Sequence, residues 1–578
     1  MAEVGFDIPA LLALPARKEQ VRVADGILRA LVDRGIDKVF GIPGGAISPL
    51  YDALIDAQID VVICQHEGMA MYMAYGYARG TGKPAVVMVT SGPGTLNTVT
   101  GTAAAKMDEV PILVLAGDVK TSMAGLGTLQ DGGLAGVDVA HVMRPLTKRV
   151  EVVMRPGRAV SSIHQALDTC MARPRGPVFL CVPMDLANAQ SPPPQVINEE
   201  RSLPVADERV SGHIAQALAG AMRPAILLGV GARLAGVAPE VYRLAERTRC
   251  PVITDIEAKG LFPESHALSM GLVGVGSTGV AESYLAGGVD LLLTVGARLD
   301  DTTTSGFSEL LRPEGTVIQL DHNPDRLNRA LDYDVGVVCD LLGTMRRVEH
   351  VARAPSPFLV LSRDDAIREA KRRAPARIAP ELADAPHHPG AVVRALQQLL
   401  PADTVYTTDI GNHLIFAAQY LVLDRPDCFH ASIGLGGMGS GVGTAMGLAM
   451  YHGADRPVVG ICGDGSLRMV GNDLATCAAN DIPVVLAVFN DGQLGMVEHG
   501  NSRVFGRSAF CESPPVDVVA YARSLGAQAV RITRPRDLVR AKRLVGTGPL
   551  VLEFPIRSEV RANNPRAEVF AFPDESSR

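Results

Sequence analysis

One stretch, residues 460–493, constrains the fold of this chain more than any other. A short apolar run over 457–462 leads into a Gly-Asp-Gly-Ser turn at 463–466, and a second apolar run covers 482–489. Short, uniformly apolar runs are typical of buried parallel strands, and the residues between them, 467–479, read as a helix. The stretch is therefore expected to form a strand–helix–strand unit of a parallel α/β sheet.

Two carboxylates of this unit, Asp464 and Asp491, are expected to lie together. Each follows one of the two strands, and open α/β sheets bind ligands beyond the carboxyl ends of their strands. Hard oxygen ligands suit Mg²⁺, which usually shares its coordination shell with phosphate groups. The glycines beside Asp464 let a diphosphate approach the backbone closely. Gly-Asp-Gly alone is usually a simple turn, and it is the spacing to Asn490-Asp491 that favours a metal and phosphate site.

The stretch resembles the thiamine-diphosphate signature of the superfamily that contains acetolactate synthase, pyruvate oxidase and pyruvate decarboxylase. That signature is Gly-Asp-Gly followed after a fixed gap by Asn-Asn, and Asn490-Asp491 departs from it at the second position. The resemblance implies that Mg²⁺ is held by Asp464, by the side chain of Asp491 and by the backbone carbonyl of Gln493. Asp is an ordinary Mg²⁺ ligand, so the departure concerns affinity rather than binding.

Length and composition indicate a globular α/β protein of several domains. A chain of 578 residues is too long for one core, and its net charge of −7 gives no reason to expect nucleic acid or membrane binding. The nine cysteines include no Cys-x-x-Cys pair, which favours buried free thiols in a reducing cytoplasm. No run of 18 uncharged apolar residues occurs, so we expect a cytoplasmic protein without a membrane span.

Strand, glycine turn and helix alternate along most of the chain, which predicts an α/β fold of three doubly wound parallel-sheet domains. By the resemblance these are a pyrimidine-binding, a central and a diphosphate-binding domain. We expect His387-His388 to be solvated in the second of two linkers, which should hold one short helix. The expected order is a leader (1–20), the first domain (21–190), a linker (191–207), the central domain (208–350), a linker (351–389), the third domain (390–556) and a tail (557–578).

Glu67 is the predicted catalytic carboxyl. A lone Glu in the first turn of a helix is usually a surface residue that the helix dipole favours. The sequence His66-Glu67-Gly68 nevertheless matches the activating glutamate of the family, which shares a proton with N1′ of the cofactor pyrimidine. Apolar neighbours such as Met69 and Tyr72 would raise the pKa of this carboxyl toward the working pH.

The resemblance also assigns roles outside the signature. Met438 would support the bent cofactor, and the Gly436 carbonyl and the Met438 amide would bond its aminopyrimidine; the alternative for Met438 is a core filler. Gln130 would line the active site, and an exposed loop amide is the alternative. The full expected set is Glu67 and Gln130 for catalysis; Gly436, Met438, Gly463, Asp464, Gly465, Ser466, Asp491 and Met496 for the cofactor; Asp464, Asp491 and Gln493 for the metal; and Gly44, Gly45, His499 and Gly500 for substrate.

The central domain leaves FAD as an open alternative. Gly229-Val230-Gly231-Ala232 is a weak dinucleotide signal, and residues 296–301 resemble the flavin segment of acetolactate synthases. Three departures count against a match: Thr302 stands for an Arg, Met184 for a Lys, and Val275-Gly276-Ser277 for Met-His-Gly.

The resemblance implies thiamine-diphosphate-dependent decarboxylation of pyruvate or another 2-oxoacid, followed by joining of the acetyl unit to a second carbonyl compound. A 2-oxoacid decarboxylase, an acetyltransferase to a non-pyruvate acceptor, a flavin oxidase and a catalytically silent nucleotide-binding homologue are the alternatives, and intact Glu67 and Asp464 argue against silence. In the superfamily two subunits share each site, so we expect a homodimer or a dimer of dimers.

The acceptor site departs most from the synthase pattern. Gly500 replaces a Trp that contacts the second ketoacid, and the chain contains no Trp. We expect a wider, less apolar acceptor pocket flanked by Glu498 and His499. The alternative is a loop that refolds so that another side chain fills the gap.

Overall fold

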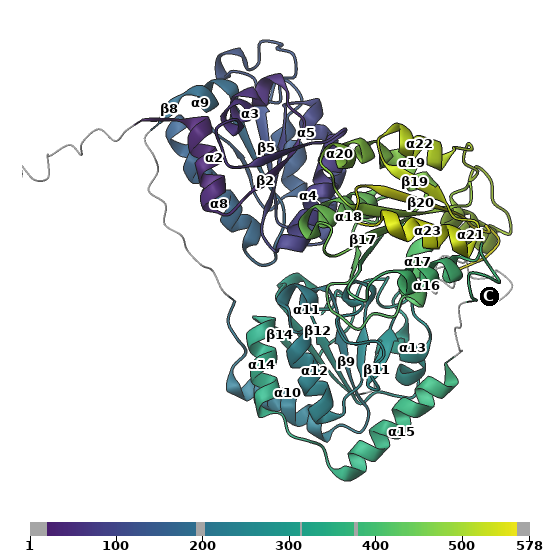
Figure 1. Cartoon of the computed structure of the whole chain (residues 1–578). Coiled ribbons are helices and arrows are strands. Elements are labelled where there is room, and N and C mark those ends of the chain that lie inside the picture. Colours follow the sequence, from purple (N-terminus) through teal and green to yellow (C-terminus); the bar gives the residue numbers. More distant parts are fainter. Residues whose placement is uncertain (1–19, 192–202, 313–314, 375–379, 563–578) are drawn as a thin grey trace, which may run out of the picture.

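The computed structural model describes residues 20–191, 203–312, 315–374 and 380–562, so nearly all of the expected leader, most of the first linker and most of the tail lie outside the described residues. The chain forms three α/β domains, each built around a six-stranded parallel sheet with helices on both faces (Figure 1). The expected fold class is confirmed.

The first domain has the strand order β3-β2-β4-β5-β7-β6. A small antiparallel pair, β1 with β8, joins the beginning of this domain to its end. Its strands are β1 (Val21–Arg22), β2 (Lys38–Gly41), β3 (Asp60–Ile63), β4 (Ala85–Val89), β5 (Ile112–Asp118), β6 (Val150–Val152), β7 (Val178–Pro183) and β8 (Gln190–Ser191). Its helices are α2 (Val23–Asp33), α3 (Ser48–Leu54), α4 (Glu67–Thr81), α5 (Pro93–Asn97), α6 (Val99–Met107), α7 (Val139–Met143), α8 (Pro156–Met171) and α9 (Met184–Asn188).

The third domain repeats the strand order of the first, as β16-β15-β17-β18-β20-β19. The predicted strand–helix–strand unit is present, but its helix is broken by one 3-10 turn at Gly471–Asp473. Its strands are β15 (Val405–Thr408), β16 (Phe429–Ala431), β17 (Val458–Gly463), β18 (Val484–Asn490), β19 (Gln528–Arg531) and β20 (Leu550–Pro555). Its helices are α16 (Pro389–Leu399), α17 (Asn412–Tyr420), α18 (Ser440–His452), α19 (Asp464–Val470), α20 (Leu474–Ala479), α21 (Gly495–Phe505), α22 (Val518–Ser524) and α23 (Pro535–Ala541).

The central domain has a different strand order, β11-β10-β9-β12-β13-β14, which is the order of dinucleotide-binding folds. Its strands are β9 (Pro224–Leu228), β10 (Val252–Thr254), β11 (Ser269–Leu272), β12 (Leu291–Val295), β13 (Thr316–Asp321) and β14 (Val335–Val338). Its helices are α10 (Glu208–Gly220), α11 (Val230–Ala235), α12 (Ala238–Thr248), α13 (Val280–Leu285), α14 (Leu341–Val351) and α15 (Pro357–Arg373).

The second expected linker contains a helix, but the expectation that this helix is short is wrong. Helix α15 has 17 residues and packs on the central domain, where Arg363 is fully buried. The Arg363 guanidinium donates hydrogen bonds to carbonyl groups at the ends of α10 and α12, including Leu218 O at 2.9 Å. Helix C-termini carry unsatisfied carbonyls and partial negative charge, so a buried cation suits this position.

The two histidines of this region are half-buried and form hydrogen bonds within the protein, where fully solvated side chains were expected. His387 Nδ1 lies 2.7 Å from Pro555 O, and the His388 side chain accepts a hydrogen bond from Gly390 N at 3.1 Å. His388 is therefore the N-cap of α16, and its ring also packs edge-on against Phe416 and Tyr420.

Helices α4 and α18 join the first and third domains through very close contact. A Cβ atom at Gly76 would lie 2.2 Å from the Thr444 carbonyl oxygen, and one at Gly447 would lie 2.0 Å from the Met73 carbonyl oxygen. A continuous hydrophobic core runs across this contact from one domain into the other. The two helix backbones can meet in this way only because glycine occupies both positions.

Two further expectations concern the whole chain. All nine cysteines are free and buried, as expected. Among the residues that the structure describes, no helix is long and apolar enough to cross a membrane.

Candidate active site

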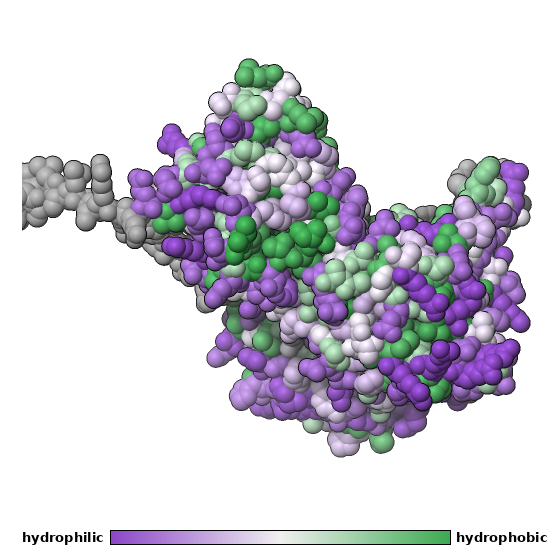
Figure 2. All heavy atoms as spheres, turned by 45° about the horizontal axis from the view of Figure 1, so that its top comes forward, coloured by the Kyte–Doolittle hydropathy of each residue, from purple (hydrophilic) through white to green (hydrophobic). Residues whose placement is uncertain are grey.

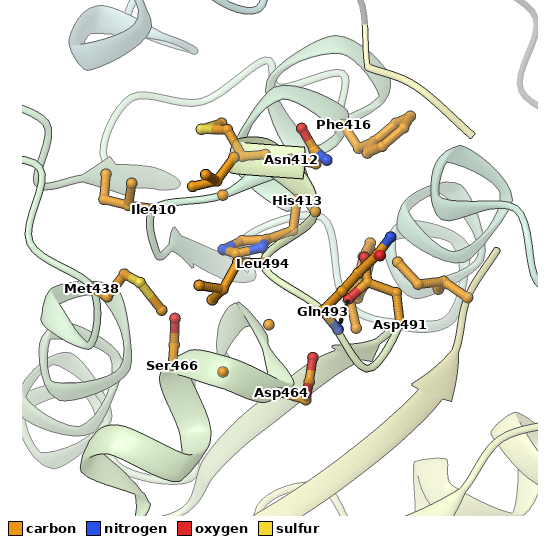
Figure 3. Close-up of a pocket in the computed structure, with 18 residues that line it drawn as sticks. Ile410, Asn412, His413, Phe416, Met438, Asp464, Ser466, Asp491, Gln493 and Leu494 are labelled. Carbon is orange, nitrogen blue, oxygen red and sulfur yellow. Dashed lines mark hydrogen bonds between the residues drawn. The ribbon is translucent and has the colours of Figure 1, made fainter. Parts of the chain in front are cut away.

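A cavity of about 660 Å³, including its open mouth, lies at the carboxyl edge of the third-domain sheet (Figure 3). The segments that follow β15, β17 and β18 form most of its wall. Figure 3 labels ten of its lining residues, of which Met438 comes from the segment after β16: Ile410, Asn412, His413, Phe416, Met438, Asp464, Ser466, Asp491, Gln493 and Leu494. The cavity therefore lies where parallel sheets bind ligands.

Asp464 and Asp491 both line this cavity, as the sequence predicts. Asp464 is buried, and its Oδ1 has no hydrogen-bond partner among the described residues. Burial raises the pKa of Asp464; burial and then the charge of Asp464 raise the pKa of Asp491 to about 6. Two neighbouring carboxylates whose charged forms are both disfavoured are suited to a cation.

The remaining ligands for such a cation must be neutral or come from a bound molecule. No group of three or more His, Cys, Asp and Glu residues that could hold a metal ion occurs in the described part of the chain. The Gln493 amide lies beside Asp491 in Figure 3, and its backbone follows directly from the same turn. Two carboxylates supplemented by neutral oxygens fit Mg²⁺, which completes its shell with water and phosphate.

Sequence reasoning missed His413 and Asn412. The His413 ring is buried and points into the cavity (Figure 3), and its Nε2 has no hydrogen-bond partner in the described residues. Burial lowers the pKa of this imidazole. A buried polar atom without a partner costs free energy, and a ligand in the cavity would supply that partner. Both residues lie a few positions after the buried strand β15, but no local sequence pattern marks them as facing the cavity.

Met438 also reaches this cavity, and its segment is held by Asp409, another residue that the sequence did not point to. The Asp409 carboxylate is fully buried and accepts hydrogen bonds from Gly439 N at 2.8 Å and Gly441 N at 2.9 Å. Gly436, with φ of 72°, precedes Met438 in the same segment but does not line the cavity.

The other expected residues of the third domain fall into two groups. Gly463, Gly465, Ser466 and Met496 line the cavity. His499 lies behind the wall: Asn412 Nδ2 donates to its Nδ1 at 3.1 Å, and its Nε2 donates to Ser558 O at 2.7 Å. Gly500 belongs to helix α21, not to a loop, and lies one turn after Met496 on the same face.

The expected residues of the first domain do not line this cavity. Glu67 begins α4 with 9% of its surface exposed, and Asn97 Nδ2 donates to its Oε2 at 2.9 Å. Its environment is thus less apolar than the sequence predicts. Gln130 is exposed and has a φ of 61°, while Gly44 and Gly45 form the turn after β2.

Comparison with known proteins places these features in one class of enzyme. Residues 21–138 match the N-terminal TPP binding domain of the thiamine pyrophosphate enzymes, residues 212–348 the central domain, and residues 409–554 the C-terminal TPP binding domain. Thiamine pyrophosphate is another name for thiamine diphosphate. The fold and the cavity thus define a thiamine-diphosphate-dependent enzyme.

Relatives that match this chain over most of their length indicate which family within this class it belongs to. The chain is 31% identical to the acetolactate synthase isozyme 3 large subunit of Escherichia coli (strain K12) over 90% of this chain and 91% of that protein. It is 34% identical to the acetolactate synthase large subunit of Parasynechococcus marenigrum, over 92% of this chain and 87% of that protein. The chain is also 31% identical to a probable acetolactate synthase large subunit of Methanocaldococcus jannaschii, over 89% of this chain and 88% of that protein. The chain belongs to the acetolactate synthase-like family of thiamine-diphosphate-dependent enzymes.

The carboxylate pair predicts a measurable effect on stability. The raised pKa of Asp491 means that its charged form is disfavoured in the folded protein, so part of the free energy of unfolding is lost as the pH rises through about 6. Asp491→Asn removes that charge. It should increase the free energy of unfolding of cation-free protein at pH 7.5 by about 1 kcal/mol, after allowance for solvent screening.

Urea unfolding in EDTA at pH 5 and pH 7.5 measures this effect. The gain should shrink at pH 5, where Asp491 of the wild type is already protonated. Asp455→Asn, which removes an exposed carboxylate of the same domain, is the control and should show no such pH dependence. An equal gain at both pH values, or a loss at pH 7.5, would contradict the repulsion between Asp464 and Asp491.

Proposed function

We propose that this enzyme removes CO₂ from pyruvate or another 2-oxoacid and joins the remaining acetyl unit to a second carbonyl compound, with thiamine diphosphate and Mg²⁺ as cofactors. The observation that supports the proposal most is the cavity that combines Asp464 Oδ1 with His413 Nε2, two buried atoms that have no hydrogen-bond partner among the described residues. A cation would satisfy the first and a diphosphate oxygen the second. Nine buried free thiols suit a reducing compartment, so we place the enzyme in the cytoplasm.

The cavity residues divide the work of holding the cofactors. Asp464, Asp491 and Gln493 would hold Mg²⁺, while Gly465, Ser466 and His413 would contact the diphosphate. Met438 and Met496, which line the cavity, and Gly436, which precedes Met438 in its segment, would contact the organic rings. Thiamine diphosphate supplies an electron sink for decarboxylation, and the protein supplies binding, orientation and proton control.

Glu67 is suited to hold a proton against the cofactor. Asn97 donates to its Oε2 and so fixes the carboxyl plane. Gly94 lies beside Oε1 and adds no side chain there; a Cβ atom at Gly94 would lie 3.4 Å from that oxygen. Oε1 is therefore the atom that would exchange a proton with the pyrimidine nitrogen of the cofactor.

We propose that two copies of the chain share each site, because Glu67 does not line the cavity of its own chain. The loop that carries Gln130 exposes an unusual amount of apolar surface: the exposed fractions are 78% for Leu126, 85% for Leu129 and 90% for Leu134. Figure 2 shows hydrophobic residues, coloured green, on the surface of the first domain that faces the viewer. A second copy is the occupant that covers this loop and brings Gln130 to its cavity, which gives a homodimer or a dimer of dimers.

Mixing of inactive variants tests the shared site. Glu67→Gln should lower turnover by roughly 10²–10⁴-fold without loss of cofactor binding, because only the proton-exchanging group is changed. Asp464→Ala should abolish Mg²⁺-dependent cofactor binding. A heterodimer of the two variants has one intact site, so activity should return after subunit exchange. If exchange is demonstrated by native mass spectrometry and no activity returns, the sites are not shared.

FAD does not fit the central domain well, and we propose that this enzyme binds none. At the point where the strand order reverses, between β9 and β12, the two following loops touch. Gly231 N donates to Gly296 O at 2.8 Å, and a Cβ atom at Gly231 would lie 2.7 Å from the Gly296 Cα. The crevice in which a dinucleotide would lie is therefore closed by backbone.

The charges at this edge also disfavour a flavin diphosphate. Arg298 already pairs with Asp108 and Glu257, and Arg326 pairs with Glu109. Burial raises the pKa of Glu257 to about 8, so this edge already destabilises its own negative charge. Purified protein should therefore show no flavin absorbance near 450 nm after incubation with FAD and gel filtration. Stoichiometric retention of FAD would contradict the proposal.

The acceptor pocket is the part of the site where this chain differs from the synthase pattern. Gly500 lies on the face of α21 that continues from Met496, and a Cβ atom there would meet nothing within 4 Å. The space is therefore open, and we propose that the acceptor is larger or more polar than 2-oxobutyrate. Glu498 would face its polar part, whereas the expected contact from His499 would require its ring to leave Asn412 and Ser558.

Product analysis tests both the function and the acceptor. Mass spectrometry of products from pyruvate, alone and with a panel of aldehydes and ketoacids, should detect CO₂-depleted condensation products that depend on thiamine diphosphate. Gly500→Trp should suppress the reaction with the large acceptor more than the pyruvate self-condensation, because an aromatic ring fills roughly 150–250 Å² of contact surface. Gly500→Ala is the control. Equal loss of both reactions would contradict the pocket assignment, and no condensation product at all would contradict the function.

A further inference from the structure

Asp108 is a fully buried carboxylate that receives hydrogen bonds from all three domains. From the first domain, Tyr75 OH donates to its Oδ2 at 3.0 Å. From the central domain, Arg298 Nη2 donates to its Oδ1 at 3.1 Å. From the third domain, Ser432 Oγ donates to Oδ2 at 2.7 Å and Gly434 N donates to Oδ1 at 3.1 Å. The carboxylate thus has two donors on each oxygen.

The third-domain partners of Asp108 begin the segment that ends at Met438. Gly434 approaches the carboxylate so closely that a Cβ atom there would lie 2.3 Å from Asp108 Oδ1. The other end of the segment is fixed by Asp409, which accepts from Gly439 N at 2.8 Å. The segment that carries Met438 is therefore fixed at one end by Asp108 of the first domain and at the other by Asp409 of the third domain, and Met438 lines the cavity.

We propose that Asp108 is a positioning residue, which sets the segment 432–438 from the first domain and so holds Met438 in the cofactor cavity. Arg298 connects the same carboxylate to the central domain and is itself held by Glu257, with Nε 3.2 Å from Oε2. The central domain thereby supports the cofactor site without contributing a residue to it. The part of this inference that concerns cofactor affinity rests on the proposed function.

The adjacent residue, Glu109, is a matched control. It is also buried, and the hydrogen bonds of its carboxylate among the described residues come from the central domain: His322 at 2.5 Å, Asn323 at 3.2 Å and Arg326 at 2.5 Å. Glu109 therefore ties the first domain to the central domain but not to the Met438 segment. If Asp108 only tied domains together, substitution of Asp108 and of Glu109 would have the same effect on the Met438 segment.

Hydrogen exchange of the cofactor-free protein tests the positioning directly. An amide in place of the carboxylate turns one acceptor oxygen into a donor, so Asp108→Asn leaves two of the four donors without an acceptor. We expect the backbone amides of residues 434–438 to exchange at least roughly tenfold faster in this variant. Glu109→Gln should leave their exchange unchanged, although both variants lower the unfolding temperature. Equal exchange in the two variants would overturn the proposal.

Calorimetric titration with thiamine diphosphate and Mg²⁺ gives the functional readout. The dissociation constant should rise by roughly tenfold in Asp108→Asn and stay within about twofold in Glu109→Gln. If Asp108→Asn does not fold, Ser432→Ala removes one donor alone and should show the same effects at smaller size. Faster hydrogen exchange in Asp108→Asn without a loss of cofactor affinity would overturn the proposed role of Asp108 in holding Met438 for the cofactor. A wild type that binds no cofactor would overturn the proposed function, while the exchange result still decides the positioning.

Discussion

The close packing of α4 on α18 is the contact on which the rest of the structure depends. Gly76 and Gly447 let the two helix backbones meet, and a larger residue at either position would collide with a carbonyl group of the other helix. Each helix also begins at a segment proposed for the reaction: α4 at Glu67, and α18 directly after Met438 and Gly439. The contact that unites the first and third domains therefore also determines where both segments lie.

Four buried or partly buried carboxylates shape the cofactor cavity and its surroundings. Asp409 and Asp108 hold the two ends of the Met438 segment, and Asp464 and Asp491 create a local excess of negative charge. The pair Asp108 and Asp409 differs from the pair Asp464 and Asp491 in its hydrogen-bond donors. Both carboxylate oxygens of Asp108 and of Asp409 accept hydrogen bonds from the chain itself, whereas Asp464 Oδ1 has no hydrogen-bond partner among the described residues. A carboxylate with all its donors supports structure, and one that lacks them is available to a ligand.

Much of the fold could be predicted because its central strands are uniformly apolar, as in the unit around Asp464 and Asp491. Edge strands such as β6 and β14 escaped notice because they are short and half-exposed. The length of helix α15 could not be predicted because the helix buries only Arg363, Ala366, Ile367 and Ala370. Asn412 and His413 were missed because nothing in a local pattern shows that a side chain after one strand faces a carboxylate after another. The domain boundaries proposed from the sequence remain predictions.

The central claim is that the cavity beside Asp464 holds a diphosphate through a divalent cation. Calorimetric titration of the wild-type protein with thiamine diphosphate and with thiamine monophosphate, each in Mg²⁺ and in EDTA, tests it most directly. The structure predicts binding of about one thiamine diphosphate per chain in Mg²⁺, a loss of affinity of roughly 100-fold or more in EDTA, and weak binding of the monophosphate. Equal affinity with and without Mg²⁺, or for the two phosphates, would contradict the account.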